Sequence, residues 1–226
     1  MKLQSLEQLY EKALSEIKGE KGVVTINIGG IPKTSKSNDI IGNCVQEWIP
    51  QWLEDNGLIL ETNISSQKFP DFTAHINNIK YDMEVKCWNH ANAPAFDIAN
   101  FDSFYREIYN SPNKLYAKYL IFAYLPIRHG FKIENIFLKN LWVITSNSKN
   151  YPIGLQVKQK RPYAIRPFAF HKYPDKSFKD VQEFIDAIYE TRKIFILDEM
   201  IEPVLWHKKS DRNIEIKIMT ICYEFI

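Results

Sequence analysis

Asp71, Glu84 and Lys86 flank a tight turn in the stretch FPDFTAHINNIKYDMEVKCW (Phe69 to Trp88). Asparagine tolerates the positive φ that a two-residue hairpin turn demands, so Asn77-Asn78 predicts a β-hairpin. The pairing that this turn imposes places Asp71 directly opposite Glu84, with Cβ atoms about 5 Å apart. Lys86 follows on the same strand. The hairpin therefore predicts two oxygen donors and one cation at a single point of a sheet.

Alternation along the second strand supports the same prediction. A period of two places Asp82, Glu84 and Lys86 on one face and apolar residues on the other. Two opposed carboxylates repel each other unless a cation joins them, and a divalent ion with oxygen ligands is suited to that position. The alternative is a solvated hairpin face, on which Glu-x-Lys pairs contribute little to stability.

A family resemblance rests on these residues. Pro70-Asp71, followed on the next strand by Glu84-Val85-Lys86, resembles the motif of the PD-(D/E)xK nuclease superfamily, and specifically of its type II restriction endonucleases. Three further stretches are similar to parts of those enzymes: Ile40–Ile49, Phe96–Leu125 and Gln159–Phe168. The resemblance spans residues 38 to 190 and implies an α/β fold with a mixed central β-sheet flanked by helices.

The resemblance implies a metal-dependent phosphodiesterase. Asp71 and Glu84 would hold one or two Mg²⁺ ions, with a main-chain carbonyl near Val85 as a further ligand. The metal would polarise the scissile phosphate and lower the pKa of a bound water. Lys86 would either orient or deprotonate that water, or stabilise the charge that builds up on phosphorus. Glu47, at the edge of the apolar face of its helix, fits either a member of the site or a solvated residue.

Charge is distributed unevenly although the net charge is only +2. From Asn135 to Pro174 the chain contains no Asp or Glu, which predicts a positive face towards a polyanion. We expect residues 147–175 to contact DNA as a basic segment; the alternative is a basic loop that its aromatic residues pack on the core. The basic residues expected at phosphates or bases are Lys158, Lys160, Arg161, Arg166 and Lys172, with Lys33 and Lys36 as a second contact.

The patterning predicts the elements that position these residues. Hydrophobic periodicity and capping residues indicate helices and strands in alternation, as in an α/β domain. We expect helices from Ser5 to Gly19, at Asp39–Asp55 with a kink or break at Pro50, at Phe96–Tyr109, and from a cap at Ser177 to about Arg192; a short helix leading into a buried strand at Lys114–Leu125; and strands at Gly22–Ile28, Asn140–Ser146 and Asn213–Ile226. No linker is evident, so a single nuclease domain spanning residues 1–226 is expected.

Composition excludes several classes of protein. Hydrophobic residues make up 45% and charged residues 25% of the chain, a balance typical of a soluble globular protein. We find no apolar stretch of membrane-spanning length and no secretory signal, so we expect a cytoplasmic protein that does not contact membranes. The three cysteines lack any CxxC spacing and the five histidines lack metal-ligand spacing, although His75 shares the Asp71 face by alternation.

The expected function is therefore that of a type II restriction enzyme, a sequence-specific Mg²⁺-dependent endonuclease that hydrolyses double-stranded DNA. Two scissile bonds on opposite strands of a palindromic site favour a two-fold homodimer. The alternatives are a structure-specific repair or junction nuclease of the same superfamily, a non-catalytic DNA-binding protein on a nuclease scaffold, and a metal-free interaction domain.

Overall fold

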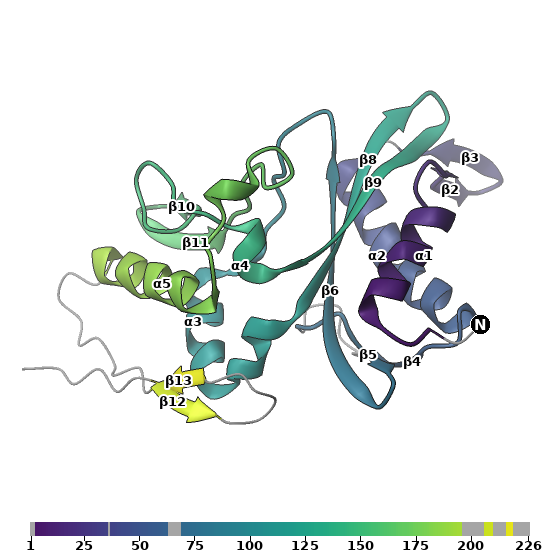
Figure 1. Ribbon diagram of the computed structural model, residues 1–226. Coiled ribbons are helices and arrows are strands. Elements are labelled where there is room, and N and C mark those ends of the chain that lie inside the picture. Colours follow the sequence, from purple (N-terminus) through teal and green to yellow (C-terminus); the bar gives the residue numbers. More distant parts are fainter. Residues whose placement is uncertain (1–2, 36, 63–68, 196–205, 210–215, 219–226) are drawn as a thin grey trace, which may run out of the picture. The chain divides into compact units, whose positions relative to one another are not determined.

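The computed structural model describes residues 3–35, 37–62, 69–195, 206–209 and 216–218 (Figure 1). These form two compact units, each described here by itself: unit 1 is Met1–Phe96 with Tyr116–Leu141, and unit 2 is Asp97–Leu115 with Trp142–Ile226. The expectation that they act as one nuclease domain stays a prediction. None of the described helices combines the length and hydropathy that a membrane span needs.

Unit 1 is built on a six-stranded sheet with the strand order β1-β9-β8-β6-β5-β4. Strands β6 and β8 are parallel and all other neighbours are antiparallel, which confirms the predicted mixed sheet. The strands are β1 (Lys21–Gly22), β4 (Ile59–Thr62), β5 (Phe72–Ile76), β6 (Ile79–Asn89), β8 (Lys118–Ile127) and β9 (Gly130–Asn140). Most of β8 is buried, as expected of a central strand that begins after a short helical turn, η1 (Pro112–Tyr116).

Helices α1 (Leu6–Glu16) and α2 (Asn38–Asp55) pack on one face of this sheet through a shared apolar core. Alternate strand residues such as Met83, Val85 and Phe122 supply the sheet side of that core. Helix α2 is not broken at Pro50. Its buried stripe of Ile41, Val45, Ile49 and Leu53 continues on both sides of the proline, so packing compensates for the lost main-chain hydrogen bond.

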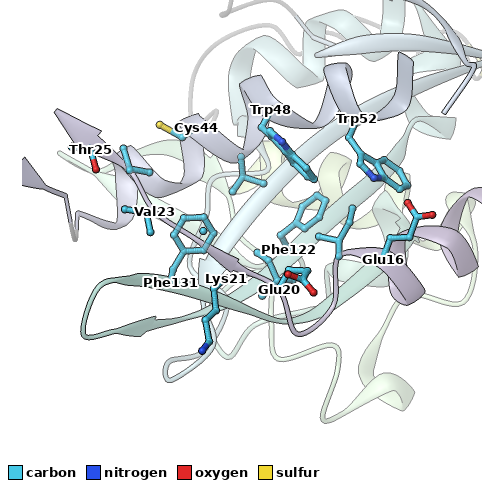
Figure 2. Close-up of a pocket in the computed structure, with 15 residues that line it drawn as sticks. Glu16, Glu20, Lys21, Val23, Thr25, Cys44, Trp48, Trp52, Phe122 and Phe131 are labelled. Atoms are coloured by element: carbon cyan, nitrogen blue, oxygen red, sulfur yellow. The ribbon is translucent and has the colours of Figure 1, made fainter. Parts of the chain in front are cut away.

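A pocket of about 720 Å³ opens among α1, α2 and the β1-β9-β8 side of the sheet (Figure 2). Its lining is largely aromatic and aliphatic. The labelled side chains include Trp48 and Trp52 from α2, with Phe122 and Phe131 from the sheet.

The β5–β6 hairpin has the predicted turn and register. Asn77 and Asn78 have φ values of 49° and 62°, the left-handed conformation that a two-residue turn of this kind requires. Phe72 pairs with Met83 and Thr73 with Asp82, so the position before β5 lies against the centre of β6.

Two predicted strands are wrong in part. The segment Gly22–Ile28 divides between β1 and a separate strand, β2 (Thr25–Ile28), which pairs with β3 (Ile31–Thr34). Gly29 and Gly30 have φ values of 60° and 82°, so they supply the tight turn between β2 and β3.

The strand predicted at Asn140–Ser146 is instead the short helix α4 (Leu141–Ile144). A short apolar run does not distinguish a strand from a buried helix. Here the fully buried residues Leu141 and Ile144 are three positions apart, as helix packing requires. The preceding segment, β9, takes the place in the sheet beside β8.

Unit 2 contains a three-stranded sheet with the order β10-β11-β7 and two longer helices. Its elements are β7 (Ala99–Asn100), α3 (Phe101–Asn110), β10 (Leu155–Lys158), β11 (Arg161–Ile165), η2 (Pro174–Lys176) and α5 (Val181–Phe195), with β12 (Trp206–Lys209) and β13 (Ile216–Ile218) as a separate antiparallel pair. The strand predicted at Asn213–Ile226 lies mostly outside the described residues.

Side-chain caps fix where the two longer helices of unit 2 begin. Helix α3 begins later than predicted because Asn100 caps it, accepting the Ser103 amide at 3.0 Å. At α5 the cap is Asp180, which accepts the Glu183 amide at 2.9 Å, while the hydroxyl of Ser177, the predicted cap, donates to the carbonyl of Val143.

Candidate active site

Asp71 lies against the strand that carries Glu84. Its Oδ2 accepts the main-chain N–H of Val85 at 2.7 Å, and its Oδ1 accepts the side-chain amide of Gln46 from α2. These two donors fix the carboxylate at the point where β5 begins and β6 passes beside it. The hairpin therefore brings Asp71 and Glu84 together, as its turn predicted.

Glu84 is buried, with 7% of its surface exposed. Its Oε1 forms an ion pair with Lys86 Nζ at 2.7 Å, so the two side chains share one face of β6. Its Oε2 is buried and has no hydrogen-bond partner among the described residues. A buried carboxylate oxygen without a partner is costly, so this atom has the capacity to accept a cation or a donor from outside the chain.

Burial disfavours the ionised form of both carboxyl groups. Burial raises the pKa of Glu84; the Lys86 charge lowers it and the Asp71 charge raises it again. Burial also raises the pKa of Asp71, opposed by the Val85 amide, the Lys86 charge and the Gln46 amide. A divalent cation bound between the two groups would favour the ionised form of both and offset the cost of burying their charges.

The donor set fits a hard, oxygen-seeking cation. Among the residues that the structure describes, no three or more His, Cys, Asp or Glu side chains gather closely enough to form a metal site by themselves. The carboxylates of Asp71 and Glu84 are therefore the side-chain donors that the hairpin brings together. Mg²⁺ is commonly bound by one or two carboxylates, with waters and substrate phosphate completing its coordination.

A pocket of about 400 Å³ opens beside Asp71. Its lining comes from α2, the end of β4 and the start of β5: Asn43, Gln46, Glu47, Pro50, Thr62, Asp71 and Phe72. Glu47 is exposed on the pocket wall, whereas its neighbour Gln46 reaches Asp71. The sequence analysis named Glu47, from the family resemblance of its helix, as either a member of the site or a solvated residue, and it did not consider Gln46.

Tyr119 is a further residue that the sequence analysis missed. In the parallel register of β6 and β8 it is the partner of Glu84. It is fully buried, and its hydroxyl has no hydrogen-bond partner within the described part of the chain. Burial raises the pKa of Tyr119 well above its usual value, and the charges of Glu84 and Asp71 add to that shift. The phenol therefore remains a neutral donor in the neighbourhood of the two carboxylates.

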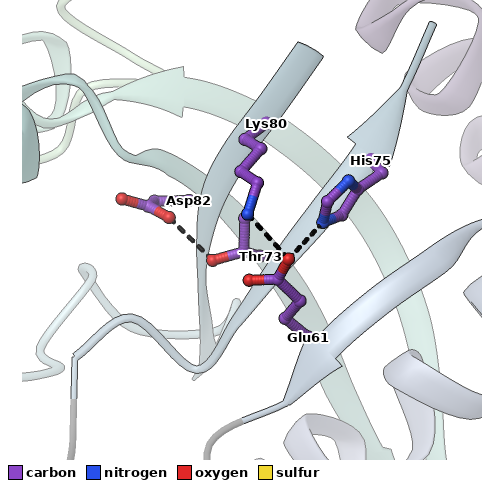
Figure 3. Close-up of polar contacts among 5 residues, drawn as sticks. All are labelled: Glu61, Thr73, His75, Lys80 and Asp82. Carbon is purple, nitrogen blue, oxygen red and sulfur yellow. Dashed lines mark hydrogen bonds and ion pairs between the residues drawn. The ribbon is translucent and has the colours of Figure 1, made fainter. Parts of the chain in front are cut away.

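Other polar residues of the hairpin are already paired (Figure 3). Glu61 Oε1 contacts both His75 Nε2 and Lys80 Nζ at 2.7 Å, and Thr73 Oγ1 donates to Asp82 at 2.8 Å. His75 lies on the Asp71 face by alternation, and on that face it contacts Glu61 of the edge strand β4. These five side chains on β4, β5 and β6 therefore have polar partners, whereas Oε2 of Glu84 has none within the described part of the chain.

The central part of the basic segment, residues 155–165, forms the β10–β11 hairpin in unit 2. Gln159 and Lys160 occupy its turn with φ values of 50° and 60°, and Lys158, Lys160 and Arg161 are all exposed at its tip. Lys158 Nζ lies 3.4 Å above the ring of Tyr163. The hairpin therefore presents three cationic side chains to solvent from a short, regular element.

The remaining predicted DNA contacts differ in environment. Arg166 forms an ion pair with Asp97, so its charge is compensated within unit 2. Lys172 is exposed in the same unit, and Lys33 is exposed on β3 in unit 1. Lys36 lies outside the described residues.

Comparisons with known proteins identify the family of the chain. Residues 3–216 match the family model described as NgoBV restriction endonuclease. The chain is 32% identical over 192 residues to the type II restriction enzyme NlaIV of Neisseria lactamica, covering 82% of this chain and 79% of that enzyme. It is 27% identical over 163 residues to the type II restriction enzyme NgoBV of Neisseria gonorrhoeae, covering 71% of this chain and 92% of that enzyme. The solved NlaIV restriction endonuclease superimposes with a TM-score of 0.73 at 32% identity, over 84% of this chain and 80% of the other.

Proposed function

Because the chain belongs to the NgoBV restriction endonuclease family and is a type II restriction enzyme, we propose that Asp71, Glu84 and Lys86 form its hydrolytic centre. Among the functions that the sequence left open, family membership supports sequence-specific DNA cleavage. The observation that carries the assignment of the site is the buried, unpartnered Oε2 of Glu84 beside Asp71 and Lys86.

In this proposal Asp71 and Glu84 are metal ligands, with the carbonyl of Val85 as a third oxygen donor. When bound, a divalent cation supplies Lewis-acid polarisation of the phosphate and a lowered pKa for an attacking water. The amides of Gln46 and Val85 orient Asp71 before the cation arrives. We propose Mg²⁺ as that cation because all the available donors are oxygens and few of them come from protein.

Lys86 has two roles that its position allows. Its ammonium group lies 2.7 Å from Glu84 Oε1, which keeps a positive charge next to the place where the phosphate would bind. From there it can orient the attacking water or stabilise the charge that develops on phosphorus. Glu47, on the wall of the adjacent pocket, is proposed as an auxiliary member that contacts water or metal from the α2 side.

The direct test is digestion of a plasmid with the purified protein. We expect discrete fragments with Mg²⁺ and none in EDTA, and sequencing of the fragment ends would give the cut position. Addition of Zn²⁺ in place of Mg²⁺ is the matched comparison for the oxygen-donor argument. Equal cleavage in EDTA would remove the metal-dependent mechanism.

Substitutions on α2 separate the contributions of Gln46 and Glu47. We expect Gln46→Ala to weaken the binding of Mg²⁺ by about tenfold, because loss of one hydrogen bond to a charged group costs roughly 1.5 kcal/mol. Glu47→Ala should leave Mg²⁺ affinity within about twofold if its carboxylate acts only through water. Titration calorimetry with Mg²⁺ measures both, and a larger loss for Glu47→Ala would make it a direct ligand.

We also propose that the β10–β11 hairpin tip contacts DNA through Lys158, Lys160 and Arg161. The exposed charges, the acid-free surroundings in sequence and the DNA substrate support this proposal. Arg166, Lys172, Lys33 and Lys36 are proposed as weaker phosphate contacts, Arg166 least because Asp97 already pairs with it.

Salt dependence tests the hairpin contact. Lys160→Ala should weaken DNA binding uniformly across sequences and reduce the slope of log K against log salt by about 1, the value for one phosphate contact. Lys132→Ala is the matched control, because Lys132 is paired with Glu134 and is not a proposed contact. An unchanged slope for Lys160→Ala would show that its charge does not meet a phosphate.

The proposed assembly is a homodimer on double-stranded DNA. The centre proposed in each chain is the Asp71–Glu84 pair, whereas cleavage of both strands at a two-fold symmetric site needs two such centres related by that symmetry.

A further inference from the structure

An exposed apolar ribbon extends from unit 1. Strands β2 and β3 form an isolated two-stranded sheet in which every residue except Thr34 is exposed. Ile28 pairs with Ile31 and Ile26 with Lys33, so these four side chains share one face. Ile28 and Ile31 are 76% and 75% exposed. A lone two-stranded ribbon is only marginally stable in water, so an exposed apolar face on it indicates a binding surface.

A complementary groove lies at the base of this ribbon. It is the pocket of about 720 Å³ between α1, α2 and the sheet, and Thr25, the first residue of β2, belongs to its lining (Figure 2). Trp48 stands in its wall and is 46% exposed, although tryptophan is usually well covered. Ile28 and Ile31 of the same chain do not fill the groove, because both remain exposed and neither belongs to its lining.

We propose that two copies of this chain associate by reciprocal insertion, each ribbon placing Ile28 and Ile31 in the groove of the other copy. A two-fold interface uses the same patch on both subunits, so that patch must carry both a projection and a matching depression. Unit 1 carries both the projecting ribbon and the groove, and the two adjoin at Thr25, which begins β2 and also lines the groove.

Charge complementarity also favours a second copy as the occupant. Lys33 lies on the apolar face of the ribbon, while the charged residues of the groove lining are two acids, Glu16 and Glu20, and one base, Lys21, so the groove carries a net negative charge. Insertion would bring this cation to those carboxylates. DNA, the other candidate for an exposed ribbon with a lysine, would be repelled by the acidic groove residues. The proposal takes from the proposed function only the requirement for two copies; the residues that carry it lie outside the catalytic cluster.

The oligomeric state tests the ribbon face. By sedimentation velocity at micromolar concentration, we expect the wild-type chain to be a dimer and the Ile28→Lys/Ile31→Lys variant a monomer with an unchanged circular dichroism spectrum. Ile59→Lys is the matched control, because Ile59 is 67% exposed on the edge strand β4 and should not affect dimerisation. A dimeric double variant would overturn the proposal, and a dimeric double variant with weakened DNA binding would reassign the ribbon to DNA.

A mixing experiment tests the reciprocity. Trp48→Lys should damage the groove and also yield monomers. A mixture of Trp48→Lys with Ile28→Lys/Ile31→Lys restores one intact ribbon and one intact groove in each heterodimer. We expect association only in the mixture, with an affinity at least tenfold above that of either variant alone. Absence of heterodimers would overturn reciprocal insertion. A Glu84→Gln chain should remain dimeric, so failure of the interface and failure of the active site are distinguishable.

Discussion

The Glu84→Gln variant is expected to lose DNA cleavage by about 10³-fold or more while it still folds and binds DNA, the upper range for removal of one charge-stabilising group. Glutamine keeps the shape of the side chain and can still meet Lys86 through its amide oxygen. It removes the negative charge that would hold a divalent cation at the buried Oε2 position. Single-turnover plasmid cleavage measures the loss, and fluorescence anisotropy without divalent metal measures DNA affinity.

A matched variant controls for charge removal in the same hairpin region. Glu61→Gln removes a carboxylate that forms an ion pair with Lys80 and also contacts His75 on the edge of the sheet. We expect it to cleave at the wild-type rate. If Glu84→Gln also cleaved at that rate, the assignment of the catalytic centre would be lost.

The hairpin part of the candidate site was predictable because it depends on local rules. Two asparagines in a tight turn fix the register, and the register fixes which side chains oppose each other. Asp71, Glu84 and Lys86 therefore follow from one short stretch of sequence. The ion pair between Glu84 and Lys86 follows from the same alternation.

Contributions from distant segments were not predictable in this way. Tyr119 comes next to Glu84 only through the parallel pairing of β6 with β8, and no turn connects these strands to fix their register. Gln46 reaches Asp71 because α2 packs across the sheet with a particular rotation. A helical pattern gives the buried stripe of Val45 and Ile49, but it does not say which flanking side chain meets a given strand residue.

The errors in the fold have similar causes. The apolar residues Ile26 and Ile28 read as part of one sheet strand, because alternation predicts extended backbone without saying what the strand pairs with. They belong instead to a ribbon whose apolar face is exposed, the feature that suggests a second copy of the chain. A departure from the pattern of a buried strand thus marks a candidate interface.

Substitution of Lys86 tests whether its charge controls the protonation of the Glu84 carboxyl group. The Lys86 charge lowers the pKa of Glu84, while burial raises it. Lys86→Met should therefore raise the pKa of Glu84 further above its usual range, so the carboxylate stays protonated to a higher pH. Since metal binding needs the ionised form, the pH midpoint for Mg²⁺ binding should move upwards. Cleavage at neutral pH should fall by about 10²-fold or more, the scale of general acid–base and charge stabilisation by one group.

The stability of the metal-free protein should change with pH in a defined direction. A carboxyl group with a folded pKa above its unfolded value contributes stability below the unfolded pKa, and that contribution is lost as pH rises through the folded pKa. Lys86→Met enlarges this loss, because the buried Glu84 charge then has no cation beside it. Thermal unfolding in EDTA should therefore show the variant below wild type at neutral pH, with the gap narrowing towards acid. Lys80→Met is the control, since its partner Glu61 is on the surface. A gap that widened in acid would mean that Lys86 does not act on Glu84 through charge.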